Sequence, residues 1–248
     1  MKYLLIFILF NGIGICEEQY SYFTKGNDAM LDSRYDDAIE SYKAIIELGY
    51  ESGNLYYNLG NAYFRKDYIG KAIWAYYKSM EFYPRDNDVK HNISIAKTRI
   101  IDRIELPETL FLFEFYKNLR GYLTTTEWFL FGSILCLCIS MMYLALNTSL
   151  IITRLLKMIL PFFIMLGSCI HLIAFDSYFY KKMSKSAVIV ENSVNAYSEP
   201  HSGKNTILFM INEGIVAKIT NYQNDWSEII LIDGKKGWIK TKALLPLK

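Results

Sequence analysis

The stretch YYNLGNAYFRKDYIGKAIWAYYKSMEFYPRD, residues 56–86, decides the fold of the N-terminal half of the chain. Small residues stand at Gly60 and Ala72, where two antiparallel helices of one hairpin can approach closely. The many aromatic side chains of the stretch can fill the gaps toward a neighbouring hairpin. The stretch therefore predicts a pair of packed helices that stacks on further helices.

The same pattern occurs a second time, 34 positions earlier, and such a fixed period indicates stacked helical repeats. The interval aligns Gly26 with Gly60, Asn27 with Asn61, Ala38 with Ala72 and Tyr42 with Tyr76. The second copy resembles the tetratricopeptide repeat, whose characteristic positions are occupied by Tyr56, Leu59, Gly60, Tyr63, Ala72, Tyr76 and Pro84. The first copy, from about Gln19 to Ser52, has Tyr50 in place of the terminal proline.

A further helix is predicted directly after the second copy, in the segment DNDVKHNISIAKTRI, residues 86–100. It opens with Asp and Asn residues that can cap a helix, and apolar residues follow at roughly helical spacing. We expect this helix to cover the open end of the repeats. Residues 19–104 then form an all-α solenoid of two tetratricopeptide repeats and a capping helix.

Repeats of this family bind peptide segments in a concave groove lined by their inner helices. The resemblance assigns this role to Phe23, Asn27, Tyr57, Asn61, Phe64, Arg65 and His91. Phe23 and Tyr57 stand where related repeats that clamp a carboxylate carry lysine, so the resemblance does not extend to recognition of a C-terminal carboxylate. The alternative is that these side chains only pack against the capping helix or the membrane-proximal segment.

Two apolar stretches, 128–146 and 158–175, are predicted as transmembrane helices joined by a short connection. The first spans about 28 Å at the helical rise. Residues 105–127 mix aromatic, aliphatic and charged side chains, which suits an amphipathic segment lying on the membrane surface. His171 lies within the second stretch, but one isolated imidazole makes no proton pathway.

The N-terminal segment 1–16 has one charged residue, a short apolar run and Cys16 at its end. This pattern predicts a signal peptide or an uncleaved anchor. Cys16 stands where a lipoprotein signal places the lipidated cysteine, and ordinary cleavage after Cys16 is the alternative. Export of the following residues would direct both soluble parts to the periplasm, although Lys181, Lys182 and Lys185 beyond the second span oppose this orientation.

From Ser186 to the C-terminus the pattern changes to five short β-rich runs separated by Gly, Asn and Asp residues. Their order resembles bacterial SH3-like domains, most closely at Gly214, Trp226, Gly234, Gly237 and Trp238. We expect residues 186–248 to form a small all-β barrel whose core is closed by Trp226 and Trp238. Tyr197, Trp226 and Trp238 are the candidate ligand contacts if the barrel binds peptides.

Composition and motifs argue against several other functions. The net charge of +2, from 27 basic and 25 acidic residues, leaves no electrostatic footprint for a nucleic acid. No catalytic motif is present, so we expect a protein without enzymatic activity, cofactor or metal. Three of the four cysteines lie in the apolar stretches, where they indicate packing and not metal binding.

The order of signal, repeats, membrane hairpin and SH3-like barrel resembles the BatE-type proteins of the bacterial aerotolerance operon over nearly the whole chain. The resemblance implies a scaffold of the inner membrane, with von Willebrand A domain membrane proteins and a MoxR-type ATPase as partners. It also implies a role in envelope stress. The rival hypothesis is an accessory protein whose barrel binds peptidoglycan, and a transporter subunit is disfavoured by the few polar residues in the spans.

Overall fold

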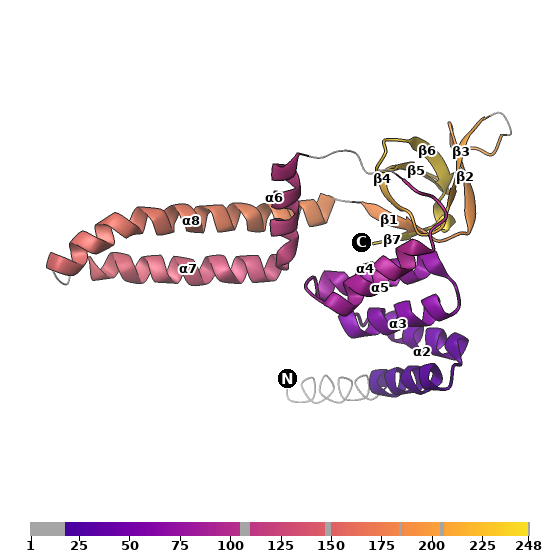
Figure 1. Ribbon diagram of the computed structural model, residues 1–248, viewed down its shortest axis with the longest axis horizontal. Coiled ribbons are helices and arrows are strands. Elements are labelled where there is room, and N and C mark those ends of the chain that lie inside the picture. Colours follow the sequence, from indigo (N-terminus) through magenta and orange to yellow (C-terminus); the bar gives the residue numbers. More distant parts are fainter. Residues whose placement is uncertain (1–17, 105–109, 147–149, 184, 204–205, 248) are drawn as a thin grey trace, which may run out of the picture. The chain divides into compact units, whose positions relative to one another are not determined.

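The computed structural model describes residues 18–104, 110–146, 150–183, 185–203 and 206–247 (Figure 1). The chain forms two compact units: Met1–Pro107 together with Lys185–Lys248, and Glu108–Ser184. The predicted signal segment and the candidate lipidation site Cys16 lie outside the described residues.

Consecutive helices make up the N-terminal part of the first unit. The described helices are residues 18–31, α2 (Tyr35–Glu47), α3 (Gly53–Arg65), α4 (Ile69–Phe82) and α5 (Asn87–Thr98). The turns after the first helix and after α3 contain Ser33 and Asp67, 34 positions apart, with φ angles of 59° and 60°. The predicted helix cap is confirmed for Asp86, whose side chain accepts hydrogen bonds from the backbone nitrogens of Asp88 and Val89, whereas Asn87 is the first residue of α5.

The close approach predicted at Gly60 is confirmed, and it occurs at both positions of the 34-residue interval. A Cβ atom on Gly26 would lie 2.5 Å from the ring of Tyr42, and one on Gly60 would lie 2.6 Å from the ring of Tyr76. Ala72 is completely buried in the same core. Each tyrosine ring therefore packs directly on the backbone of the preceding helix, where only glycine leaves enough space.

The C-terminal part of the first unit is an antiparallel sheet of seven described strands in the order β3-β2-β6-β5-β4-β1-β7. They are β1 (Ser186–Ile189), β2 (Ser193–Tyr197), β3 (Ile207–Asn212), β4 (Val216–Gln223), β5 (Trp226–Ile230), β6 (Lys236–Lys240) and β7 (Leu244–Pro246). The five predicted β-rich runs correspond to β1, β3, β4, β5 and β6, whereas β2 and β7 were not predicted. β7 is only three residues long, and its pairing with β1 is decided by the tertiary fold.

Trp226 and Trp238 are buried, as predicted, but neither belongs to the hydrophobic cluster at the centre of the barrel. Ile229 and Ile239 are fully buried in the core, and side chains along a strand alternate between its two faces. Trp226 lies three residues before Ile229, and Trp238 directly precedes Ile239. Both tryptophans therefore lie on the outer face of the sheet, where neighbouring side chains leave them only 6% and 9% exposed.

The helices and the barrel share one apolar interface. Val188 of β1 is completely buried in the hydrophobic core of the helices, and Val216 and Leu247 pack against the same core. In return, Ile100 and Ile104, which follow α5, pack against the core of the barrel. The two parts therefore fold on each other although residues 108–184 separate them in the sequence.

Hydrogen bonds fix this interface at three places. Glu213 accepts a 2.6 Å bond from the backbone nitrogen of Gly70 in the first turn of α4, which has no side-chain cap from its own N-cap residue. The indole of Trp74 donates to the carbonyl oxygen of Pro246 at 2.8 Å. Asp102 accepts bonds from the backbone and side-chain nitrogens of Asn212 at 2.6 and 2.9 Å. The barrel thus satisfies backbone groups of the helices, and the helical segment satisfies backbone groups of the barrel.

The described residues of the second unit form the helices α6 (Phe111–Tyr122), α7 (Thr125–Ala145) and α8 (Leu150–Met183). Within the described residues, Thr125–Ala145 and Leu156–Met183 are long and apolar enough to cross a membrane. Only 11% of each apolar window is buried, so these helices are unlike the core helices of a soluble protein. α8 begins at Leu150, so residues 150–157, which were expected to connect the two spans, are helical.

α7 and α8 pack side by side through small and aromatic residues. The ring of His171 lies against Gly132, where an added Cβ atom would come within 2.7 Å. His171 Nδ1 also lies 2.8 Å from the carbonyl oxygen of Gly167. Phe129 and Phe175 make an edge-to-face contact at 5.6 Å. The position of His171 is thus explained by helix packing.

Candidate protein-binding surfaces

Two equivalent hydrogen-bond networks shape the helical surface. The hydroxyl of Tyr42 donates to Asn27 Oδ1 at 2.8 Å, and the same oxygen accepts a bond from Asn58. The hydroxyl of Tyr76 donates to Asn61 Oδ1 at 2.9 Å. These bonds engage the oxygen atoms of the two asparagine acceptors and leave their Nδ2 donors out of the network.

The second network is completed by α5. Asn92 of α5 donates to Asn61 Oδ1 at 3.0 Å, just as Asn58 donates to Asn27 one interval earlier. Burial raises the pKa of Tyr42 to about 12, so its hydroxyl remains a donor at neutral pH. Burial raises the pKa of Tyr76 as well. The buried networks therefore keep a fixed pattern of donors and acceptors at physiological pH.

A cavity of about 360 Å³ lies beside the second network, a volume at the lower end of ordinary ligand sites. Its lining residues are Met30, Asn61, Phe64, Arg65, Tyr76, Asn92 and Ile95. Three of the predicted groove residues, Asn61, Phe64 and Arg65, are thus brought together. Tyr57 lies close by, because its hydroxyl accepts a 3.3 Å bond from Asn92.

The remaining predicted groove residues do not line this cavity. Phe23 stacks obliquely on Tyr42 and lines a separate apolar hollow of about 320 Å³ near the start of the first helix. Asn27 is used in the first network, and His91 is exposed on α5. The predicted set therefore divides between two hollows and the open surface.

Four lining residues were missed by the sequence reasoning: Met30, Tyr76, Asn92 and Ile95. One signal could have found Asn92. It stands 34 positions after Asn58, so the repeat interval continues into α5. Tyr76 was assigned to the core alone, and Met30 and Ile95 carry no sequence signal beyond helical spacing.

A second candidate surface lies on the outer face of the barrel, where the three candidate ligand contacts Tyr197, Trp226 and Trp238 come together. Tyr197 of β2 is paired directly with Trp238 of β6. The rings of Tyr197 and Trp226 make an edge-to-face contact at 5.4 Å. The ammonium group of Lys240 lies over the ring of Trp226 at 4.1 Å, a favourable cation–π distance.

A polar hollow of about 430 Å³ adjoins these aromatic residues. It is lined by Asn224, Asp225, Lys240, Thr241 and Lys242. Nearby, the Lys236 ammonium group lies 2.8 Å from Glu228 and lowers the pKa of that carboxyl group. The hollow thus offers two lysines, the carboxylate of Asp225 and the neutral hydrogen-bonding groups of Asn224 and Thr241.

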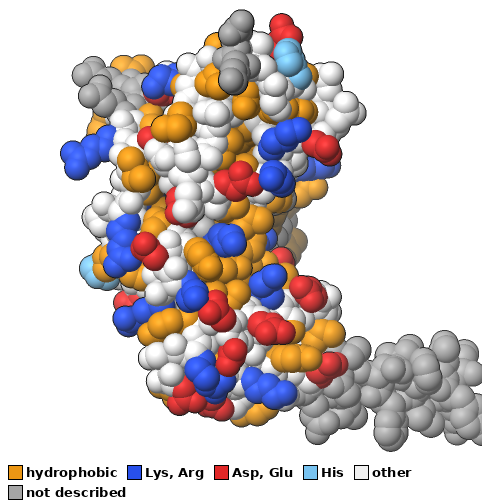
Figure 2. All heavy atoms as spheres, turned by 90° about the vertical axis from the view of Figure 1, so that its right-hand side faces the viewer, with side chains coloured by type: hydrophobic (Ala, Val, Ile, Leu, Met, Phe, Trp, Pro, Cys, Tyr) orange, Lys and Arg blue, Asp and Glu red, His pale blue; other side chains and the backbone are white. Residues whose placement is uncertain are grey.

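Charges of both signs alternate over the first unit. Figure 2 shows one face of it, with Lys and Arg side chains interspersed among Asp and Glu around a central hydrophobic area. In the part of the chain that the structure describes, no group of three or more His, Cys, Asp or Glu residues could hold a metal ion.

The comparison with known families concerns the barrel. Residues 190–245 match the family described as bacterial SH3 domain. The C-terminal region of this chain contains a bacterial SH3 domain. The match starts directly after β1, which lies between β4 and β7 in the sheet. The chain has no match among curated proteins.

Proposed function

We propose that this protein is a non-catalytic, membrane-anchored scaffold of a bacterial envelope, which holds protein partners on its helical surface. The observation that carries the proposal is the union of the helices and the SH3 domain in one unit. Their contacts join residues up to 172 positions apart in the sequence, with the apolar helices in the intervening segment. The protein would thus present two binding surfaces as one fixed body attached to a membrane.

This union constrains the membrane topology. A hydrogen bond between Gly70 and Glu213 cannot form across a bilayer, so the helices and the SH3 domain must lie on the same side. The chain between them must therefore cross the membrane an even number of times. Two apolar helices that pack against each other satisfy this condition as a hairpin. The expected signal segment favours the periplasmic side of the inner membrane.

The helical surface is suited to a peptide segment of a partner protein. The 34-residue recurrence of the glycine–tyrosine contacts and of the asparagine networks supports the assignment of residues 19–104 to tetratricopeptide repeats with a capping helix. In the cavity, Arg65 supplies a cation, and Asn61 Nδ2 is a donor that the buried network does not use. We propose that these groups bind the backbone and an acidic or polar side chain of an extended peptide.

The resemblance to BatE-type proteins suggests what those partners are. It points to von Willebrand A domain membrane proteins of the same operon and to a MoxR-type ATPase complex. A function in aerotolerance or envelope stress follows from the same resemblance. These assignments rest on the order of segments in the chain, and the cavity beside Asn61 is where we expect a partner to bind.

Labelling of single cysteines tests the topology. Cysteines introduced at Asn87, Asn224 and Lys157, with the native cysteines replaced, are treated with a membrane-impermeant thiol reagent in intact spheroplasts. All three positions are exposed in the structure. We expect labelling at Asn87 and Asn224 and protection at Lys157. Protection at Asn87 or Asn224, or labelling at Lys157, would contradict the periplasmic hairpin.

Photo-crosslinking in cells tests the binding surface. A photoreactive amino acid at Arg65, in the cavity, is compared with one at Lys43, an exposed position of α2 outside the cavity. We expect Arg65 to give a discrete crosslinked product of higher mass that Lys43 does not give. The asparagine substitution Asn61→Ala should reduce this product. Equal crosslinking from both positions would contradict binding in the cavity.

The second candidate function is peptidoglycan binding by the SH3 domain. The observation that favours it is the hollow with Lys240 and Lys242 beside the aromatic surface, since stem peptides carry carboxylates. The test is co-sedimentation of the detergent-solubilised protein with purified sacculi. Binding that is lost in Lys240→Ala with Lys242→Ala, and kept in Lys218→Ala on the same domain, would support this function. No sedimentation with sacculi would exclude it.

A further inference from the structure

Helix α6 of the second unit exposes an unusual amount of apolar surface. No residue of α6 is buried. Phe111 and Leu112 are 79% and 74% exposed, and Phe115 is 56% exposed. A short helix with such a surface needs a partner, because contiguous exposed apolar patches on soluble proteins mark interaction sites.

The apolar residues of α6 gather on one face. At 100° per residue, Phe111, Leu112, Phe115, Leu119 and Tyr122 fall within a single arc of the helix. Glu114, Lys117 and Gly121 lie outside this arc, Asn118 borders it beside Phe111, and Phe113 lies on the far side next to Lys117. This division into an apolar face and a polar face is typical of helices that lie in the plane of a membrane surface.

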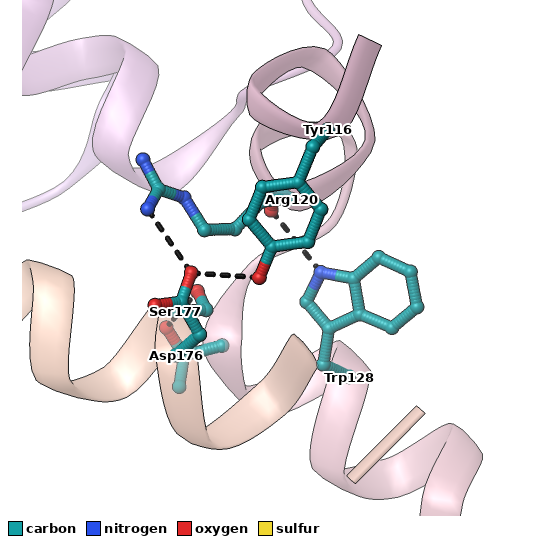
Figure 3. Close-up of polar contacts among 6 residues, drawn as sticks. Tyr116, Arg120, Trp128, Asp176 and Ser177 are labelled. Atoms are coloured by element: carbon teal, nitrogen blue, oxygen red, sulfur yellow. Dashed lines mark hydrogen bonds and ion pairs between the residues drawn. The ribbon is translucent and has the colours of Figure 1, made fainter. Parts of the chain in front are cut away.

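A polar cluster fastens α6 to α8 (Figure 3). The hydroxyl of Tyr116 donates to Asp176 at 2.8 Å, and the Arg120 guanidinium donates to the same carboxylate oxygen at 3.1 Å. The guanidinium also stacks on the ring of Tyr180 at 3.6 Å. The Arg120 side chain is 15% exposed and that of Asp176 is 44% exposed, so the ion pair is partly shielded from solvent.

The junction of α6 with α7 is equally well defined. Only two residues separate the helices, and Thr124 and Glu127 form a capping box at the start of α7. The indole of Trp128 donates to the carbonyl oxygen of Arg120 at 3.2 Å (Figure 3). α6 is thus held by both of its neighbours at the point where the apolar stretches of α7 and α8 end.

We propose that α6 binds the surface of the phospholipid bilayer, with its apolar face inserted below the headgroups, and that the Arg120–Asp176 pair fixes it in this orientation. The inference rests on the proposal that α7 and α8 span the membrane. Their covalent and polar connections to α6 then bring this helix to the level of the headgroups. Trp128, Tyr178 and Tyr180 lie at the same level, as aromatic residues of membrane proteins do at the interface.

Nitroxide accessibility tests the orientation of α6 in the full-length protein reconstituted into phosphatidylethanolamine–phosphatidylglycerol vesicles. Single spin labels are placed at Phe111 and Phe115 on the apolar face, and at Glu114 and Lys117 on the polar side. We expect high oxygen and low nickel-chelate accessibility at the first two positions and the reverse at the last two. High nickel-chelate accessibility at all four positions would overturn the proposal, and protection from both reagents at Phe111 and Phe115 would overturn it in favour of a protein partner.

A label at Leu130 of α7 separates this test from the test of membrane spanning. Leu130 is 58% exposed on an apolar helix, so it should show high oxygen and low nickel-chelate accessibility if α7 crosses the bilayer. If Leu130 behaves in this way and the α6 labels do not, only the inference about α6 fails. If Leu130 is accessible to the nickel chelate, the membrane hairpin itself fails, and the inference about α6 falls with it.

Substitutions in the polar cluster test the role of the ion pair as a positioning element. Arg120→Gln and Asp176→Asn should each abolish the difference between the labels at Phe115 and Glu114, and increase label mobility. The matched control is Lys117→Gln, which removes an exposed cation of the same helix on the polar face. Exchange of the two charges, Arg120→Asp with Asp176→Arg, should restore part of the difference. An unchanged difference in Arg120→Gln would refute the positioning role.

Discussion

Replacing Gly70 by alanine tests the docking of the helices on the SH3 domain. A Cβ atom at this position would lie 2.5 Å from the carbonyl oxygen of Ile189 and 3.0 Å from the Cα atom of Val190. Both are backbone atoms, so they cannot rotate away as the end of a side chain can. The interface must open by nearly the difference between 2.5 Å and the ordinary contact distance of 3.4 Å.

Overpacking and the loss of a hydrogen bond both destabilise the docked state of Gly70→Ala, and together they outweigh the higher helix propensity of alanine. Overpacking costs about 1–3 kcal/mol. The bond from Gly70 to the Glu213 carboxylate is a bond to a charged group, and its loss costs about 1.5–3 kcal/mol. Alanine returns at most about 1 kcal/mol, because it favours the helix more than glycine does. We therefore expect Gly70→Ala to destabilise the docked state by about 2–4 kcal/mol.

Hydrogen exchange of the full-length protein in detergent micelles measures this change. Amides of β1 and of the first turn of α4 should exchange about 30-fold faster or more in Gly70→Ala. The control is Gly121→Ala, which adds a methyl group at a helical glycine with no atom within 4 Å. If Gly70→Ala exchanges like the wild type in these segments, the interface does not depend on this contact and the reasoning is wrong.

Three further predictions concern other contacts. Tyr76→Phe removes the hydroxyl that donates to Asn61, so the helices should lose about 1 kcal/mol of stability. A thermal melt monitored by circular dichroism measures this loss. Tyr20→Phe, at an exposed site, should have no effect. Gly132→Leu collides with the ring of His171, so the α7–α8 pair should separate at a lower fraction of sodium dodecyl sulfate than in the wild type; equal resistance would contradict the packing. The ion pair with Lys236 lowers the pKa of Glu228, so it contributes stability above about pH 4.5 that is lost as the pH falls through the lower folded-state pKa. Glu228→Gln should therefore reduce the acid dependence of the SH3 domain's stability in denaturant titrations. An unchanged acid dependence would contradict this role of the ion pair.

Most of the secondary structure could be predicted because it follows from local spacing. The 34-residue interval indicated the helical hairpins, since each small residue and its aromatic partner recur where two helices approach. Uncharged stretches indicated the two apolar helices, because few soluble elements are apolar on all sides. The glycines and tryptophans of the last 60 or so residues indicated an SH3-like fold, although β2 and β7 were missed because short strands carry little pattern of their own.

The candidate sites could be predicted only in part. Asn61, Phe64 and Arg65 share a cavity because all three lie near the end of α3. Phe23 and His91 lie elsewhere, because the curvature of the helical stack is decided by packing. The tryptophans are buried as expected, but they lie on the face of the sheet opposite the central hydrophobic cluster. A side-chain period of two specifies which residues share a face, but not which of the two faces becomes the core.

The sequence by itself determined the order of the parts: helical hairpins, apolar helices and an SH3 domain, each from patterns within a few dozen residues. Only the tertiary structure decided that the helices and the SH3 domain form one unit. Glu213 caps α4, and Asp102 satisfies Asn212, across intervals of 143 and 110 positions. Such pairs leave no periodic signal, because the partners meet only after the intervening chain has folded back. The contacts that join the two candidate binding surfaces, and with them the membrane topology that we propose, are therefore a property of the folded chain.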